Sequence, residues 1–163
     1  MPDVVSKQVR SRMMSGIRGK NTKPELALRS ELHRRGFRYR LYDKALPGQP
    51  DMVFPRFKAV ILVNGCFWHG HDCHLFKWPS TRADFWHDKI IKNKARDERN
   101  LEAYQTLGLR TLVVWECSLK GKSRLGIGYV AEVAARWLQF DHQNAEISGS
   151  VTIHHLHSKK TRQ

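Results

Sequence analysis

Apolar and polar positions in the first third of the chain predict a helix. Thr22 is suited to cap its first turn, Glu25 completes a capping box, and Leu28 and Leu32 share one face. Gly36 is expected to end the helix. In this interpretation Glu25 has a structural role, so pattern alone gives no reason to assign it a chemical one.

Three strands are predicted to follow. Residues 37–42 alternate aromatic or apolar side chains with arginines, which is typical of a half-exposed strand. A Pro- and Gly-rich turn at 46–50 leads into a short strand at 51–54, and residues 58–63 read as a buried strand antiparallel to it. Residues 64–74 follow directly after the second strand of this hairpin.

The second half predicts a helix from Thr81 to about Leu107, a buried strand at 109–117 and an amphipathic helix over 127–138. Asp97 falls on the apolar stripe of the long helix, where a carboxylate needs a partner. The order helix, three strands, helix, strand, helix predicts an α/β sandwich with a mixed sheet.

A chain of 163 residues suits one domain with loose ends. The main domain is expected to span 22–140. Residues 1–21 are basic and show no convincing periodicity of apolar positions. They are either a flexible arm that becomes ordered when it binds phosphates or a disordered terminus. Residues 141–163 are expected to be a weakly ordered tail.

The charge balance points to a polyanionic partner. Lys and Arg number 29 against 15 Asp and Glu, a formal net charge of +14, and nucleic acid is the first candidate. A membrane partner is disfavoured because no apolar run approaches the roughly 18 residues of a span and no signal peptide follows Met1. We therefore expect a cytoplasmic protein.

Cys66, His71 and Cys73 have the donors and spacing of a zinc knuckle, and Cys117 follows the other buried run. If the two strands are neighbours, their ends meet and a four-ligand structural site closes. An odd number of cysteines disfavours a purely disulfide framework and favours metal-bound thiolates. Spacing alone also allows His69 as a zinc ligand in place of His71 or His74.

Asp51 and His69 are candidates for catalysis. Asp51 is either a turn residue that accepts from backbone donors or a hard oxygen ligand for Mg²⁺. His69 suits a general base at neutral pH, and Asp97 could orient it. The neighbouring Phe67 and Trp68 either wedge between bases or pack under the sheet, and Trp86 is equally ambiguous.

Four runs together resemble the very-short-patch repair DNA mismatch endonucleases: residues 47–51, 64–69, 71–73 and 114–117. The resemblance extends from about Val4 to Trp137. It implies a restriction-endonuclease-like three-layer sandwich, a mixed sheet flanked by helices. It also implies a strand-specific nick on the 5′ side of the T in a T:G mismatch, the lesion left when 5-methylcytosine deaminates in double-stranded DNA.

The resemblance implies a role for each candidate residue. Asp51 and the main-chain carbonyl of Val63 would bind Mg²⁺, with two ions expected. His69 would be the base, Asp97 its orienting partner and Glu25 a supporting acid. One structural Zn²⁺ would be held by Cys66, His71, Cys73 and Cys117, and the DNA contacts would be Met14, Asn64, Phe67, Trp68 and Trp86.

The chain departs from the family pattern at Val63-Asn64, which stands in place of Thr-His, so Asn64 is a neutral amide where a phosphate-contacting imidazole is expected. The resemblance further implies a nucleoid-associated monomer, with other mismatch-repair proteins as candidate partners. Two alternatives stay open: a restriction-type nuclease that cuts matched duplex, and a zinc-containing DNA-binding module without catalysis.

Overall fold

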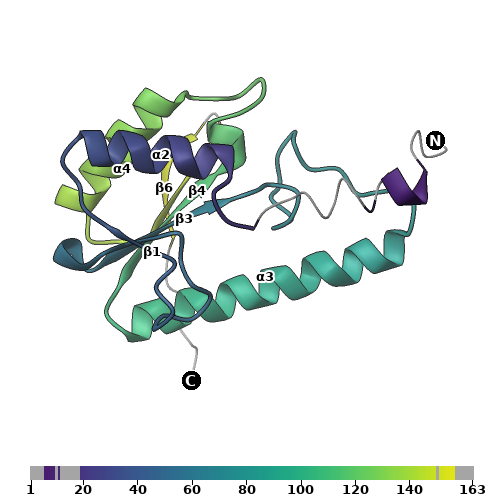
Figure 1. The fold of residues 1–163 in the computed structure, drawn as a ribbon, viewed down its shortest axis with the longest axis horizontal. Helices are drawn as coiled ribbons and strands as arrows, with labels where there is room; N and C mark the ends of the chain where they lie inside the picture. The colour runs from purple at the N-terminus through teal and green to yellow at the C-terminus, as the bar shows by residue number, and fades with distance from the viewer. Residues whose placement is uncertain (1–5, 10, 12–18, 150, 157–163) are drawn as a thin grey trace.

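The computed structural model describes residues 6–9, 11, 19–149 and 151–156. Its centre is a six-stranded sheet in the order β1-β2-β3-β4-β5-β6 (Figure 1). The β3–β4 and β4–β5 pairs are parallel and the other neighbours are antiparallel. The strands are β1 Arg40–Leu41, β2 Met52–Phe54, β3 Ala59–Asn64, β4 Arg110–Trp115, β5 Ala145–Ser148 and β6 Val151–His155.

Helices cover both faces of the sheet. α2 (Lys23–Arg34) and α4 (Ile127–Phe140) lie on one face and α3 (Ala83–Thr106) on the other (Figure 1). The larger core lies under α2 and α4, where Leu28, Leu32 and Trp137 meet inward residues of the sheet. Tyr104 of α3 packs against the opposite face. This three-layer sandwich with a mixed sheet confirms the predicted fold class.

The register of β3 and β4 determines where the site lies. The strands run parallel, with Asn64 opposite Trp115, so their carboxyl ends meet at one edge of the sheet. The segments that follow them therefore start side by side. In Figure 1 the amino-terminal half of α3 extends beyond the sheet on this side. Loops leaving this edge can thus contact that half of the helix.

The structure differs from the expectation for residues 37–42, where β1 comprises only Arg40–Leu41. Tyr42 has a left-handed backbone, with φ of 49°, which ends the extended segment. The long helix also begins later than predicted, at Ala83. Arg82 before it occupies the N-cap position and has a left-handed backbone.

The expectation of a weakly ordered tail over 141–163 is wrong for the part that the structure describes. Ala145–Ser148 forms β5 beside β4, and Val151–His155 forms β6 at the sheet edge. Ala145 and Ile147 are fully buried. A four-residue alternation is too short to be distinguished from a loop by pattern alone. The fold therefore continues to residue 156.

No helix in the described residues is long and apolar enough to cross a membrane.

If β5 is an integral strand, Ile147→Ala should lower the free energy of unfolding by about 2–5 kcal/mol, because it leaves a cavity in the core. Urea denaturation measures this loss. Ile91→Ala is the matched control, since Ile91 is 49% exposed on α3, and it should change stability by less than about 0.5 kcal/mol. Equal effects of the two substitutions would contradict the integration of β5.

Candidate active site and metal centre

Four zinc-type donors meet where β3 and β4 end. Cys66 follows β3 by two residues, Cys117 lies in the 3-10 turn Glu116–Ser118 after β4, and the loop after Cys66 brings in His71 and Cys73. One ligand atom from each of the four lies within 4.8 Å of all the others. The structure therefore brings together the donor set expected from the sequence, drawn from two separate strand ends.

The distances in this cluster fit a tetrahedral zinc ion. Zinc–sulfur bonds of about 2.3 Å and zinc–nitrogen bonds of about 2.0–2.1 Å at a tetrahedral angle place sulfur and nitrogen about 3.6 Å apart. His71 Nδ1 lies 3.6 Å from the Sγ of both Cys66 and Cys117. With four protein donors there is no open position for water, so this cluster could hold a structural metal such as zinc.

Burial affects the protonation of these ligands. It raises the pKa of the Cys66 and Cys117 thiols and lowers the pKa of the His71 imidazole. Neutral imidazole is the form that binds a metal, whereas the thiols must lose protons to do so. A bound cation would supply the positive charge that favours these thiolates.

Neighbouring groups hold the ligands in place. The Trp115 ring stacks on His71, with centroids 4.1 Å apart, and its Nε1–H donates to Glu146 at 2.9 Å. The Cys66 N–H donates to Glu116 at 3.1 Å. The Gly149 N–H donates to the Cys117 sulfur at 3.2 Å. β5 and the turn after it thus support the cluster.

The alternative ligands His69 and His74 lie outside the donor set. His74 Nδ1 is 3.2 Å from the Ser123 hydroxyl. His69 Nδ1 is 2.5 Å from Asp97 Oδ2, and Asp97 projects from α3. The apolar stripe of α3 thus carries a carboxylate that is partnered by an imidazole from the β3 loop. This contact engages Nδ1 and leaves Nε2 for proton transfer.

Asp51 lies just before β2, next to the end of β3. Its Oδ2 accepts from the Val63 N–H at 2.7 Å. Burial raises the pKa of this carboxyl to about 7, and the charge of Glu25 also raises it, whereas Val63, His69 and Arg29 lower it. A buried carboxylate in this environment is suited to a hard cation such as Mg²⁺.

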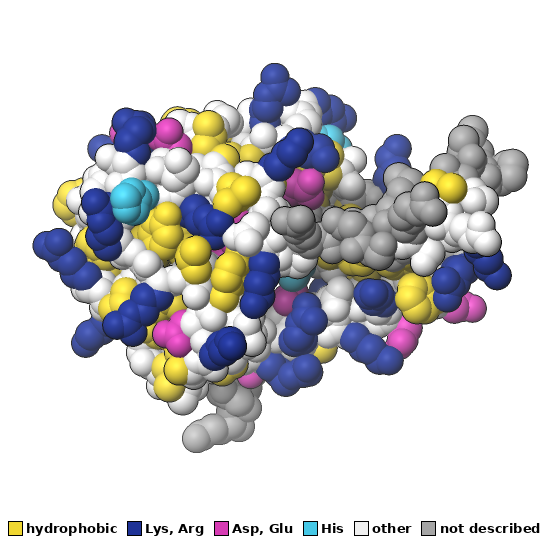
Figure 2. Space-filling model, viewed as in Figure 1, with side chains coloured by type: hydrophobic (Ala, Val, Ile, Leu, Met, Phe, Trp, Pro, Cys, Tyr) yellow, Lys and Arg dark blue, Asp and Glu magenta, His cyan; other side chains and the backbone are white. Residues whose placement is uncertain are grey.

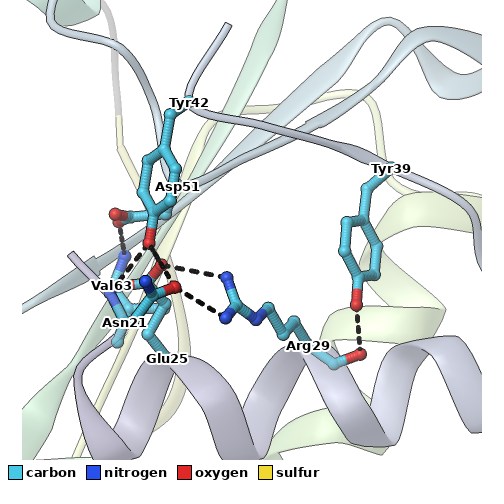
Figure 3. Close-up of polar contacts among 7 residues, drawn as sticks. All are labelled: Asn21, Glu25, Arg29, Tyr39, Tyr42, Asp51 and Val63. Carbon is cyan, nitrogen blue, oxygen red and sulfur yellow. Dashed lines mark hydrogen bonds and ion pairs between the residues drawn. The ribbon is translucent and has the colours of Figure 1, made fainter.

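Glu25 does not have the role that the capping-box pattern predicted. Thr22 occupies the N-cap position of α2 but makes no side-chain capping bond. Glu25 is 1% exposed, accepts a hydrogen bond from the Tyr42 hydroxyl and pairs with Arg29 at 3.6 Å (Figure 3). The capping interpretation is therefore wrong, and Glu25 is a buried acid whose charge acts on Asp51.

Sequence reasoning missed Arg29 and Tyr42. Arg29 could have been found, because it follows Glu25 by four residues on a predicted helix and such pairs face one another. Tyr42 gives no local signal, since its contact with Glu25 depends on how the chain after α2 returns.

The aromatic residues expected to contact DNA form a half-buried cluster. Phe67 lies 5.3 Å from both Trp68 and Trp86, measured between ring centroids, and Trp68 lies 5.8 Å from Trp86. Lys89 is within 6 Å of both tryptophan rings, at 5.5 and 5.9 Å. The cluster joins the loop after β3 to the amino-terminal half of α3, which extends beyond the sheet.

The structure describes one of the other two expected DNA contacts. Asn64 ends β3 and is half-buried opposite Trp115, whereas Met14 lies outside the described residues. Lys and Arg side chains are spread over the face shown in Figure 2. The basic residues of α3 include Lys89, Lys92, Lys94, Arg96 and Arg99. This face therefore suits a polyanion.

Comparisons with known proteins agree on one family. Residues 2–75 match the family model described as DNA mismatch endonuclease Vsr. The chain is 42% identical to the DNA mismatch endonuclease Vsr of Escherichia coli over 147 residues, which cover 90% of this chain and 94% of that protein.

Two further relatives are named as nicking enzymes. The type II nicking enzyme V.XorIIP of Xanthomonas oryzae pv. oryzae is 49% identical over 119 residues, 73% of this chain and 88% of the relative. The type II nicking enzyme V.NmeAIP of Neisseria meningitidis is 43% identical over 123 residues, 76% and 88% of the two chains.

The donor geometry predicts which histidine the zinc ion needs. Purified wild-type protein should contain one zinc ion per chain by mass spectrometry of metals. His71→Ala and Cys117→Ala should lose it and melt at lower temperature, because structural zinc contributes about 10–16 kcal/mol in small sites. His74→Ala is the control and should keep its zinc. Zinc retained by His71→Ala but lost by His74→Ala would contradict this donor set.

The raised pKa of Asp51 predicts that the free energy of unfolding decreases with rising pH in Mg²⁺-free buffer. The folded protein holds the proton until about pH 7, whereas the unfolded chain releases it near 3.8, so stability is lost as pH rises between these values. Asp51→Asn cannot ionise and should escape this loss, which reaches up to about 4 kcal/mol above pH 7. Urea denaturation from about pH 5 to about pH 8 measures the difference.

Asp88→Asn is the matched control, because Asp88 is exposed on α3 and pairs with the exposed Lys92. Its stability should differ from wild type by an amount that stays constant with pH. A constant difference for Asp51→Asn as well would show that Asp51 ionises normally in the folded protein.

Proposed function

Because the chain belongs to the Vsr family of DNA mismatch endonucleases, which has a restriction-endonuclease-like fold, we propose that it is a DNA endonuclease of mismatch repair. It nicks one strand of double-stranded DNA on the 5′ side of the T in a T:G mismatch. The observation that carries this proposal is the convergence of Asp51, Glu25 and the His69–Asp97 pair beside a basic, aromatic surface.

Asp51 and the main-chain carbonyl of Val63 are proposed to hold catalytic Mg²⁺, with two ions expected. In an extended strand the N–H and C=O of one residue point to the same side. Since the Val63 N–H donates to Asp51, its carbonyl faces the same side of β3. When bound, Mg²⁺ would stabilise the negative charge that develops on the phosphate.

His69 is proposed as the general base that takes a proton from the attacking water. Asp97 accepts from Nδ1 and so leaves Nε2 to receive that proton. As the imidazole becomes positively charged, the carboxylate of Asp97 stabilises it. Glu25 acts as a supporting acid beside Asp51.

The zinc-type cluster has a structural role in this proposal. It clamps the loop that carries His69, Phe67 and Trp68, so one anchor positions the base and two of the rings. Phe67, Trp68 and Trp86 are proposed to wedge beside the mismatch, where poorly paired bases unstack at least cost. Asn64 contacts the DNA backbone as a neutral amide.

Several further features belong to the same proposal. The basic segment 1–21, with Met14, is a further contact to the duplex. The protein acts as a monomer in the cytoplasm, associated with the nucleoid, and other mismatch-repair proteins are candidate partners. Its affinity for DNA should fall steeply with salt concentration, because each neutralised phosphate lowers the affinity by about 0.9 log units per log unit of salt.

Asp51→Ala should abolish nicking of a T:G duplex in Mg²⁺ while DNA affinity changes little, because Asp51 acts on the reacting phosphate rather than on the duplex as a whole. Nicking is read on denaturing gels and binding by fluorescence anisotropy. Asp88→Ala on the exposed face of α3 is the matched control and should nick like wild type. Persistent nicking by Asp51→Ala would refute its assignment.

The substrate is tested by offering matched and T:G duplexes with varied flanks to the wild-type protein. Nicking restricted to the T-containing strand supports the mismatch activity. Cutting of matched duplex would favour a restriction-type nuclease. Binding that is unaffected by Mg²⁺, without any nick, would favour a non-catalytic DNA-binding module.

A further inference from the structure

The side chains around Glu25 form a closed polar network that the proposed chemistry does not by itself require. Glu25 and Arg29 project from α2, and Tyr42 reaches them from the segment after β1 (Figure 3). Glu25 is almost completely buried, and a buried carboxylate without partners is strongly unfavourable. Tyr42 and Arg29 supply the partners.

The Tyr42 hydroxyl has one proton to donate, and the geometry directs it to Glu25. The Asn21 N–H donates to the same hydroxyl at 2.9 Å, so one lone pair of the oxygen is already engaged. Asn21 Oδ1 lies 3.4 Å away, a poor acceptor distance for a hydroxyl donor, whereas Glu25 Oε1 lies much closer. Tyr42 is therefore a donor to the carboxylate.

Tyr42 maintains this contact from an unfavourable backbone conformation. It has φ of 49° and Asn21, at the other end of the hydrogen bond, has φ of 56°. Left-handed backbone is uncommon for a tyrosine and persists only where surrounding contacts determine it. The Lys20 ammonium lies 4.7 Å from the centre of the Tyr42 ring and adds a further contact.

Arg29 holds the network from its other side. Its Nη2 donates to Asn21 Oδ1 at 2.7 Å, and its Nη1 lies 3.6 Å from Glu25 Oε1. Within the described part of the chain, Nη1 is buried without a hydrogen-bond partner. Its contribution to Glu25 is therefore charge rather than a hydrogen bond. Arg29 also lowers the pKa of Asp51, so its charge reaches both acids.

Both contacts engage the same oxygen of Glu25, Oε1. No described residue hydrogen-bonds to Oε2. We propose that Tyr42 and Arg29 are positioning residues, which hold Glu25 by one oxygen and present the other beside Asp51 for the reaction. This inference rests on the proposed nicking activity, because it assigns these residues to that site.

Tyr42→Phe tests the inference by removing only the hydroxyl. With a T:G duplex and Mg²⁺, kcat should fall about 10–100-fold, a loss typical of outer-shell partners, while KM and DNA affinity stay within about twofold. Tyr39→Phe is the matched control. Its hydroxyl donates to the main-chain oxygen of Arg29 at 2.8 Å rather than to a carboxylate, so kcat should stay within about twofold of wild type (Figure 3).

A double-mutant cycle separates positioning from general destabilisation. If Tyr42 acts through Glu25, then Tyr42→Phe combined with Glu25→Gln should be no slower than Glu25→Gln alone, within about twofold. Arg29→Gln combined with Glu25→Gln should lose less than the product of the two single losses, because the part of its effect that acts through Glu25 is removed only once, whereas its charge also acts on Asp51. Zinc content and the melting temperature of each variant verify that it is folded.

Two outcomes would overturn the positioning role in an active protein: losses that multiply in the double variants, or a kcat for Tyr42→Phe equal to that of Tyr39→Phe. A wild-type protein that does not nick the T:G duplex would instead overturn the proposed function, and this inference with it. The two failures are distinguishable because the second is read from wild type alone.

Discussion

Parallel pairing of β3 with β4 is the contact on which the candidate site depends. It places the two carboxyl ends side by side, and each strand is followed within two residues by a cysteine, Cys66 or Cys117. An antiparallel pair would have separated these ends by the length of the strands. Because the two thiols meet at one cluster with His71, the loop that follows Cys66 is anchored. His69 lies on that anchored loop.

The site concentrates ionisable groups that burial disfavours, and each is stabilised by a partner from a distant segment. Asp51 contacts the backbone of Val63, Glu25 contacts Tyr42, and His69 contacts Asp97 of α3. Burial keeps the pKa of Asp51 near 7, so the folded protein holds a carboxyl that ionises only reluctantly. Such a group gains most from a cation, so the burial of Asp51 agrees with the proposed Mg²⁺ chemistry.

α3 connects the proposed chemistry with the proposed DNA contact surface. Asp97 orients His69, and eleven residues earlier Trp86 joins the aromatic cluster, a separation of about 16 Å along the helix axis. The helix is long enough to pack Tyr104 against the sheet and still extend past its edge. A shift of α3 would therefore move the orienting carboxylate and the rings together.

The sequence by itself determined the order of the main elements, the four-residue zinc donor set as a candidate and the need of Asp97 for a partner, because periodicity and ligand spacing are local properties. Only the tertiary structure decided that His71 rather than His69 or His74 joins the thiols, that Glu25 is a buried acid rather than a cap, and that residues 145–148 and 151–155 complete the sheet. Those outcomes depend on contacts such as Tyr42 with Glu25 and β5 with β4, which join residues far apart in the chain. Local pattern carries no information about such contacts, since their energies come from burial and pairing that exist only after the chain has folded.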